Sequence, residues 1–250
     1  MQIDRRSILT AAMACITTGT ALKSRRGFSQ GLVTEGRIPA PQPSQDIVNS
    51  IIDSLPSSDY VSTMVALANL GISAPLGPDQ RPYNQRWPIH ANPLLVRMRH
   101  DVGYFREIDD CTSWCGVAVG WCLKRSGRPF PPDCASSQSY LRYGTPAFSP
   151  TSGDLAVFTD YGNAARGHVA VFVGWSSKTT IEILGGNQQL SDGTNCSSGV
   201  PASVIVRRTA STDSRHSRSD GTIAGRYLNQ LIQPPPPSGP PEMSTGPAVF

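Results

Sequence analysis

The spacing of apolar residues changes once along this chain, near residue 150, and this change limits the folds that the chain can adopt. Three segments before it carry apolar residues at helical intervals: "DIVNSIIDSL" (46–55), "YVSTMVALANLG" (60–71) and "NPLLVRMRHDVGYF" (92–105). Four short runs after it have the period of two and the β-branched residues of strands: 153–158, 167–175, 180–186 and 203–208. Because the helices precede the strands and do not alternate with them, the pattern predicts an α+β domain with an antiparallel sheet.

A further helix is predicted within "DDCTSWCGVAVGWCLKRSG", residues 109–127. Thr112 or Ser113 is the expected cap, and Gly127 ends the helix. Cys115 then lies in the first turn, where the positive end of the helix dipole and unpaired backbone donors favour a thiolate. Cys115 is therefore a candidate nucleophile.

The N-terminus has the pattern of an export signal. In "MQIDRRSILTAAMACITTGTALKSRRG", Arg5 and Arg6 precede an apolar run over about residues 8–22, which is too short to span a bilayer comfortably. The segment resembles a twin-arginine signal, with Asp4 where Ser is usual. We expect residues 1–29 to direct export to the periplasm or the cell exterior, and a membrane anchor that is never cut is the alternative.

The net charge argues against a nucleic-acid partner. The formal charge is +4, but the first 29 residues carry five basic groups and one acidic group, so the exported remainder is neutral. The basic stretch that remains, at 207–218, is rich in Ser and Thr and aperiodic, as in a solvated loop. We therefore expect no nucleic acid among the partners.

Five of the six cysteines lie beyond the signal, and an odd number in an oxidising compartment leaves one thiol unpaired. Cys115 is poorly placed for a disulfide with Cys111 or Cys122, since helical i,i+4 spacing holds Cβ atoms further apart than a disulfide prefers. Cys111 and Cys122 are expected to pair with Cys134 or Cys196. Because the spacings contain no CxxC pair, we expect no metal.

One of the four histidines is placed to act as a base. His168 opens an apolar strand directly after Gly167, at the edge of the predicted sheet, where a ring can face the helix N-terminus. If the strands 167–175 and 180–186 form a hairpin, the chain opposite His168 is Asn187 or Gln188, and either can orient the imidazole. The glycines of "LGGNQ" permit a bulge, so register alone does not choose between the two.

The order of these motifs resembles that of a known family. "ANPLL", Trp-Cys at a helix start, "GD" opening a strand, "GHVAVFVG" and "LGGNQ" follow one another within residues 65–192. The set is similar to CHAP-like proteins, which belong with the NlpC type to the papain-like hydrolases of bacterial cell walls. The resemblance implies a papain-like core, with the nucleophile helix packed on an antiparallel sheet.

The resemblance also implies an activity: a cysteine amidohydrolase or peptidase that cuts amide bonds of peptidoglycan peptides. Cys115 is its nucleophile, His168 its base and Asn187 its orienting group. "CTSW" also resembles the Cys-Thr-Trp form of other CHAP domains, so Cys111 is the alternative nucleophile.

The expected substrate cleft is lined by aromatic and amide side chains. Trp114, Tyr161 and Gln188 are the expected substrate-binding residues, and Trp87 is a further candidate, although a core position is common for a single Trp. No cofactor or metal is needed, and the protein is expected to be a monomer. Two other classes stay open: a non-catalytic module that binds cell-wall peptide on the same fold, and a disulfide-stabilised structural protein.

These expectations divide the chain into five parts: signal (1–29), linker and short helix (30–60), CHAP-like hydrolase domain (61–210), polar loop and C-terminal element (211–233) and disordered Pro-rich tail or spacer (234–250).

Overall fold

Helices come first and strands second, as the change of period predicts. The computed structural model describes residues 38–104, 112–189 and 203–239, all within the unit Gly31–Phe250. The export signal predicted at 1–29 lies outside these residues. The helical half contains α1 (Gln42–Ser54), α2 (Tyr60–Ser73), α3 (Pro93–Asp101), α4 (Cys115–Arg125) and the short 3-10 helix η1 (Ser137–Arg142). None of the helices described is long and apolar enough to cross a membrane.

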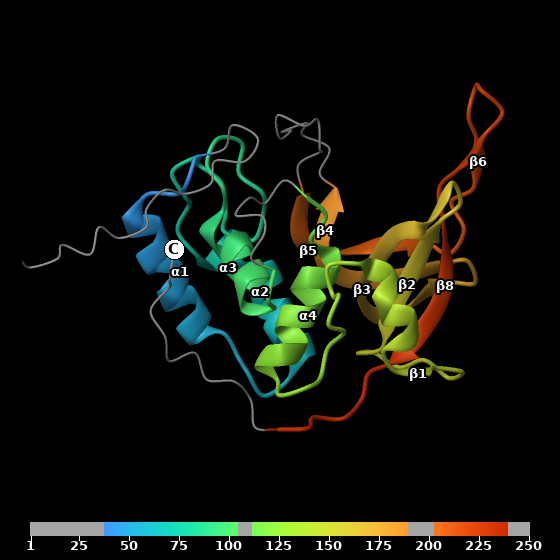
Figure 1. Ribbon diagram of the computed structural model, residues 1–250, viewed down its shortest axis with the longest axis horizontal. Helices are drawn as coiled ribbons and strands as arrows, with labels where there is room; N and C mark the ends of the chain where they lie inside the picture. The colour runs from blue at the N-terminus through green and yellow to red at the C-terminus, as the bar shows by residue number, and fades with distance from the viewer. Residues whose placement is uncertain (1–37, 105–111, 190–202, 240–250) are drawn as a thin grey trace, which may run out of the picture. The chain divides into compact units, whose positions relative to one another are not determined.

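The second half forms a six-stranded antiparallel sheet (Figure 1). Its strands are β1 (Thr145–Pro146), β2 (Leu155–Asp160), β3 (Asn163–Ser177), β4 (Thr180–Gln189), β5 (Ser203–Ser211) and β8 (Arg226–Gln233), in the order β1-β8-β2-β3-β4-β5. A small pair, β6 (His216–Ser217) and β7 (Ile223–Ala224), forms an arm that extends away from the sheet. The predicted α+β class with an antiparallel sheet is confirmed.

The last strand lies inside the sheet. β8 pairs with β2 on one side and with β1 on the other, in the register Leu155↔Ile232 and Thr145↔Gln233. It belongs to the segment 211–233, which was expected to hold a polar loop and a C-terminal element. The position of β8 in the sheet was not predicted.

In two of the four α-helices, a polar side chain caps the first turn. Asp59 accepts a hydrogen bond from the Ser62 backbone at the start of α2, and Asn92 accepts one from Leu94 ahead of α3. The cap predicted for α4 is wrong. The N-cap of α4 is Trp114 and makes no side-chain cap bond, because the helix begins one residue later than a cap at Ser113 requires and two later than a cap at Thr112 requires.

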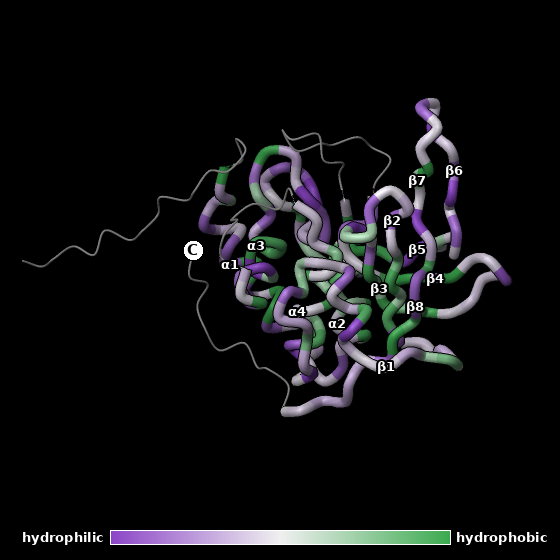
Figure 2. Tube along the Cα trace, turned by 45° about the vertical axis from the view of Figure 1, so that its right-hand side comes forward, coloured by the Kyte–Doolittle hydropathy of each residue, from purple (hydrophilic) through white to green (hydrophobic). Residues whose placement is uncertain are grey.

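The main core lies between the helices and one face of the sheet. Residues on this face alternate along β3 with residues that face the other way: Val169 and Val171 belong to the main core, whereas Ala170 and Phe172 belong to a second cluster. Hydrophobic positions gather where helices and strands meet (Figure 2). The alternation fixes which side of the sheet each residue of β3 faces.

The end of the β3–β4 hairpin is irregular. Among the described residues, the pairing of β3 with β4 runs only as far as Val171↔Leu184, so it does not reach His168. That Asn187 or Gln188 lies opposite His168 stays a prediction. The pairing of β4 with β5 shifts between Gly185 and Gln188. Asn187 lies in this bulge with φ of 57°, a left-handed conformation that Asn tolerates better than most residues.

The start of the Pro-rich tail, expected to be disordered, is ordered in this structure. The Arg128 guanidinium donates to the Pro235 carbonyl and lies 5.3 Å from the centre of the Tyr60 ring. The Ser238 backbone donates to the Gly127 carbonyl at 3.0 Å. Residues 234–239 therefore pack on the loop that follows α4.

Candidate active site

Cys115 is the first residue of α4, as predicted for a nucleophile at a helix start. The backbone N–H groups of Val169 and Gly116 are near enough to the sulfur to lower the pKa of the thiol. Val169 belongs to β3 and directly follows His168, so the thiol lies where α4 meets that strand. These donors form a fixed arrangement that can stabilise negative charge on sulfur or on a bound oxyanion.

The thiol is nevertheless protonated at rest. The Cys115 side chain is buried, with 2% of the residue exposed, and burial raises the pKa of the thiol above its ordinary value. The backbone donors and the charge of Arg226 lower it by less than burial raises it. The thiolate predicted from the helix dipole is therefore corrected, because loss of hydration outweighs the dipole at this site.

His168 is buried on the other face of the sheet from Val169, as the alternation of β3 requires. It is 5% exposed and lies opposite Phe158 of β2, with ring centres 6.5 Å apart. Burial first, and then the charges of Arg226 and Arg208, lower the pKa of His168 to about 3. The imidazole is therefore neutral at pH 7 and can accept a proton.

The two candidate catalytic groups face opposite sides of the sheet and are not hydrogen-bonded. Cys115 packs with Val169 in the main core, whereas the His168 ring, which was expected to face the helix start, lies on the side of Phe158. Among the described residues, no bond joins the Cys115 sulfur to the His168 ring, and the Nε2 atom of His168 has no partner. The Nε2 atom of Gln188, a buried residue of β4, also has none among the described residues. Unpaired buried polar atoms are uncommon in folded proteins and require an explanation such as a functional role.

Two tryptophans that were expected to line the substrate cleft are buried in the core. Trp114 is 1% exposed, and its indole N–H donates to Ser203 Oγ at 3.0 Å, so it packs in the core and lines no open cleft. Trp87 is also buried, with its N–H on the Pro82 carbonyl. Both indoles therefore serve the fold.

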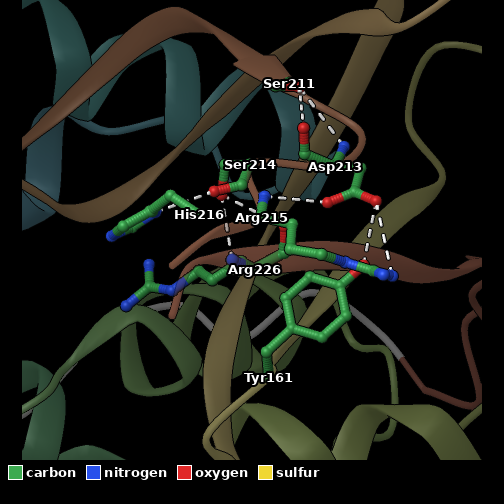
Figure 3. Close-up of polar contacts among 7 residues, drawn as sticks. All are labelled: Tyr161, Ser211, Asp213, Ser214, Arg215, His216 and Arg226. Carbon is green, nitrogen blue, oxygen red and sulfur yellow. Dashed lines mark hydrogen bonds and ion pairs between the residues drawn. The ribbon is translucent and has the colours of Figure 1, made fainter. Parts of the chain in front are cut away.

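Tyr161 follows β2 at the base of the arm. Its hydroxyl donates to Asp213 and accepts from Arg215, both at 2.9 Å, and the Arg215 guanidinium lies 4.5 Å from the ring centre (Figure 3). Tyr227 packs against the same ring at 4.9 Å. Tyr161 thus anchors the arm, and no contact joins it to Cys115 among the described residues.

Two buried arginines fix the backbone ahead of the thiol, and the sequence reasoning missed them. Arg86 donates to the Thr112 carbonyl at 3.0 Å, and Arg99 donates to the Ser113 carbonyl at 3.4 Å. Both guanidinium side chains are buried. Arg99 lies within an apolar helical pattern, "NPLLVRMRH", and a charged residue at a core-facing position is the signal that could have identified it.

The other described cysteines are unpaired. Cys122 and Cys134 are buried free thiols, so the expected pairing of Cys122 with Cys134 is wrong. Burial raises the pKa of Cys122, and burial together with Asp133 raises the pKa of Cys134 to about 12. The expected pairings of Cys111 and Cys196 lie outside the described residues. The described residues contain no cluster of His, Cys, Asp and Glu that could hold a metal ion.

No family model matches the chain, and no curated protein and no solved structure is significantly similar to it. The described residues define an α+β protein with an antiparallel sheet and a buried cysteine at the start of a helix that contacts the sheet.

Proposed function

We propose that this protein is an exported cysteine amidohydrolase or peptidase that cleaves amide bonds of peptidoglycan peptides, on a papain-like core of the CHAP or NlpC type. The observation that carries the proposal is the position of the Cys115 sulfur. It lies at a helix start, and the backbone N–H groups of Gly116 and of Val169, the residue that follows His168, favour negative charge on it. Among the described cysteines, Cys122 and Cys134 lie away from a helix start.

The reaction is acyl transfer through a thioester. His168 is neutral at rest and is the proposed base for the thiol proton. Because its ring faces away from the core side of Cys115, this step requires the start of β3 to change conformation when substrate binds. The Cys115 sulfur then attacks the amide carbonyl. The backbone N–H groups stabilise the oxyanion. The protonated imidazole then gives its proton to the leaving amine, and a water molecule, deprotonated by His168, hydrolyses the thioester. The orientation of the ring is assigned to Asn187, which lies in the bulge of β4. The proposal needs no cofactor or metal, peptidoglycan peptides are the partners, and the enzyme acts as a monomer.

A second function is favoured by one observation: both candidate groups are almost fully buried and both are neutral. A site with these properties also suits a non-catalytic module that binds cell-wall peptides in a groove without cutting them. The two functions differ in whether fragments are released.

The test is digestion of purified sacculi, with the released fragments identified by mass. The wild type is expected to release peptide fragments, and Cys115→Ala is expected to lower the rate by at least about 10³-fold. Cys122→Ala is the matched control, because Cys122 is a buried free thiol on the same helix. It should retain activity.

Two results would change the proposal. Activity that survives Cys115→Ala but is lost in Cys111→Ser would move the nucleophile to Cys111. Tight binding of sacculi by the wild type without any released fragment would favour the non-catalytic module.

A further inference from the structure

A cavity of about 680 Å³ lies beside η1, and all of its lining residues belong to the described part of the chain. Its walls are the Pro-rich loop 129–136, η1, Ala165 of β3 and Pro235, which follows β8. Neither Cys115 nor His168 lines it. Ligand sites in proteins commonly have volumes of about 300–1,000 Å³, so the cavity is large enough for a short peptide.

Hydrogen bonds hold the walls of this cavity in place. The Tyr143 hydroxyl donates to the Pro129 carbonyl at 2.6 Å, which joins the end of η1 to the Pro-rich loop. The Arg128 guanidinium donates to the Pro235 carbonyl, which joins the segment after β8 to the start of the same loop. Because these walls are fixed before a ligand arrives, binding requires little further ordering of the protein.

Two opposite charges line the cavity from different walls. Asp133 belongs to the Pro-rich loop and Arg142 to η1, and both are exposed. Among the described residues, neither charged group has a hydrogen bond or ion pair, so the two do not neutralise each other. Phe130 and Tyr143 supply aromatic surface in the same cavity. The lining therefore suits a ligand with apolar side chains, one positive group and one negative group.

Gln138 connects the cavity to the start of β3. It lines the cavity, and its Nε2 donates to the Phe158 carbonyl at 2.9 Å. A Cβ on Gly167 would lie 2.4 Å from the same Nε2, so the Gln138 amide packs directly on the residue before His168. A ligand that fills the cavity therefore contacts the side chain that lies against the part of β3 that must move in the proposed reaction.

The loop wall connects the cavity to the start of α4. Ser136 lines the cavity, and Cys134 and Ala135 directly precede it. The carbonyl oxygens of these two residues would lie 2.0 Å and 3.4 Å from a Cβ placed on Gly116. Gly116 follows Cys115 in the first turn of α4. One wall of the cavity thus continues into a segment that packs on the backbone beside the candidate nucleophile.

We infer that this cavity binds the substrate peptide, with a free amine of the peptide at Asp133 and a free carboxylate at Arg142. The inference rests on the proposed function and narrows its substrate class to short peptides that carry both groups. An ammonium group donates hydrogen bonds to a carboxylate such as Asp133, and a guanidinium such as Arg142 donates to a carboxylate of the ligand. A polyanionic chain fits less well, because Asp133 repels it.

The test measures calorimetric binding of trialanine to the Cys115→Ala protein, which cannot form the proposed thioester. Trialanine with both ends free is expected to bind, and N-acetylation or C-amidation should each weaken binding by about 3- to 5-fold. Asp133→Asn should remove the effect of N-acetylation alone, and Arg142→Gln should remove the effect of C-amidation alone. Arg166→Gln is the matched control, because Arg166 is exposed next to Ala165 but does not line the cavity. It should bind all the peptides as the parent protein does.

The outcomes separate this inference from the proposed function. If trialanine binding depends on both charges as stated, the cavity stands as a peptide site even where the wild type releases no fragment from sacculi. If the wild type digests sacculi but trialanine binds no better than its blocked forms, the cavity inference is refuted and the hydrolase remains. Binding of hexaproline without binding of trialanine would also refute it, because the cavity would then be a site for Pro-rich segments.

Discussion

The hydroxyl of Tyr140 donates a hydrogen bond of 2.7 Å to the backbone carbonyl of Gly116, the residue after Cys115. Tyr140 is fully buried in η1. Gly116 is also closely packed: a Cβ added to it would lie 2.0 Å from the Cys134 carbonyl oxygen, so only glycine fits there. The first turn of α4 is thus held by η1 and by the loop before η1.

Tyr140→Phe should weaken this support. We expect a loss of about 1 kcal/mol in the free energy of unfolding, because one buried hydrogen bond is removed, and a lower kcat on sacculi, because the first turn of α4 can move. Urea unfolding and a kinetic assay measure the two effects. The control is Tyr143→Phe, whose hydroxyl bonds to the Pro129 carbonyl near the surface. Equal effects from both variants would contradict the role given to Tyr140.

His168 should make the stability of the protein depend on pH. Its pKa is about 3 in the folded state, against about 6.5 for an unperturbed histidine, so the unfolded chain binds the proton first as the pH falls. The contribution of His168 to the free energy of unfolding is therefore fully present above pH 6.5, and it is lost as the pH falls from 6.5 to 3. We expect a loss of about 1.4 kcal/mol between pH 7.5 and 5.5.

Urea unfolding of the wild type, His168→Gln and His216→Gln at these two pH values checks the assignment. His168→Gln should lack this contribution to the pH dependence, whereas His216→Gln, altered at an exposed residue of the arm, should keep it. A wild-type pH dependence that persists in His168→Gln would assign it to another group.

Gly186 should not tolerate a side chain. A Cβ at this position would lie 2.4 Å from the Trp114 ring and 2.8 Å from Ala118, so Gly186→Ala forces β4 and α4 apart. We expect a loss of about 1–3 kcal/mol in stability, measured by urea unfolding. Gly174→Ala on β3 is the control, because its Cβ meets nothing within 4 Å. Two variants of equal stability would show that α4 does not pack on β4 as closely as described.

Two substitutions separate the backbone role of Asn187 from its side-chain role. Asn187→Gly should keep the stability of the wild type, because glycine adopts a φ of 57° easily, whereas Asn187→Ala should cost about 1 kcal/mol. Both should slow hydrolysis of sacculi by about 10-fold or more, since neither can orient His168. Full activity in Asn187→Gly would transfer the orienting role to Gln188, the other residue that the sequence left open.

Periodicity was sufficient to predict most of the fold. The helices near 46–55, 60–71 and 92–105 and the four strands from 153 to 208 are present, because each buries one continuous apolar stripe or face. β8 was missed for a physical reason. Its sequence "RYLNQLIQ" is buried mainly at Leu231 and Ile232, and a bulge opposite Val157 and Phe158 interrupts the alternation that identifies a strand.

The candidate site was predictable only in part. Spacing alone placed Cys115 at a helix start, but it placed the His168 ring on the side of that helix, whereas the alternation of β3 directs the ring to the other face of the sheet. The protonation states of Cys115 and His168 depend on how deeply both groups are buried, which results from packing between segments far apart in the chain. For the same reason, no local pattern could reveal that the charge of Arg226 lowers the pKa of both groups.

The insertion of β8 between β1 and β2 has a consequence for how the chain reaches its native state. Before residues 226–233 join the sheet, β2 is an edge strand with a row of unpaired N–H and C=O groups beside an apolar surface. Pairing β2 with β8 also closes a loop that contains β3, β4 and β5, a contact of long sequence separation that slows folding. A chain shortened before β8 should therefore aggregate rather than fold into a smaller version of the sheet.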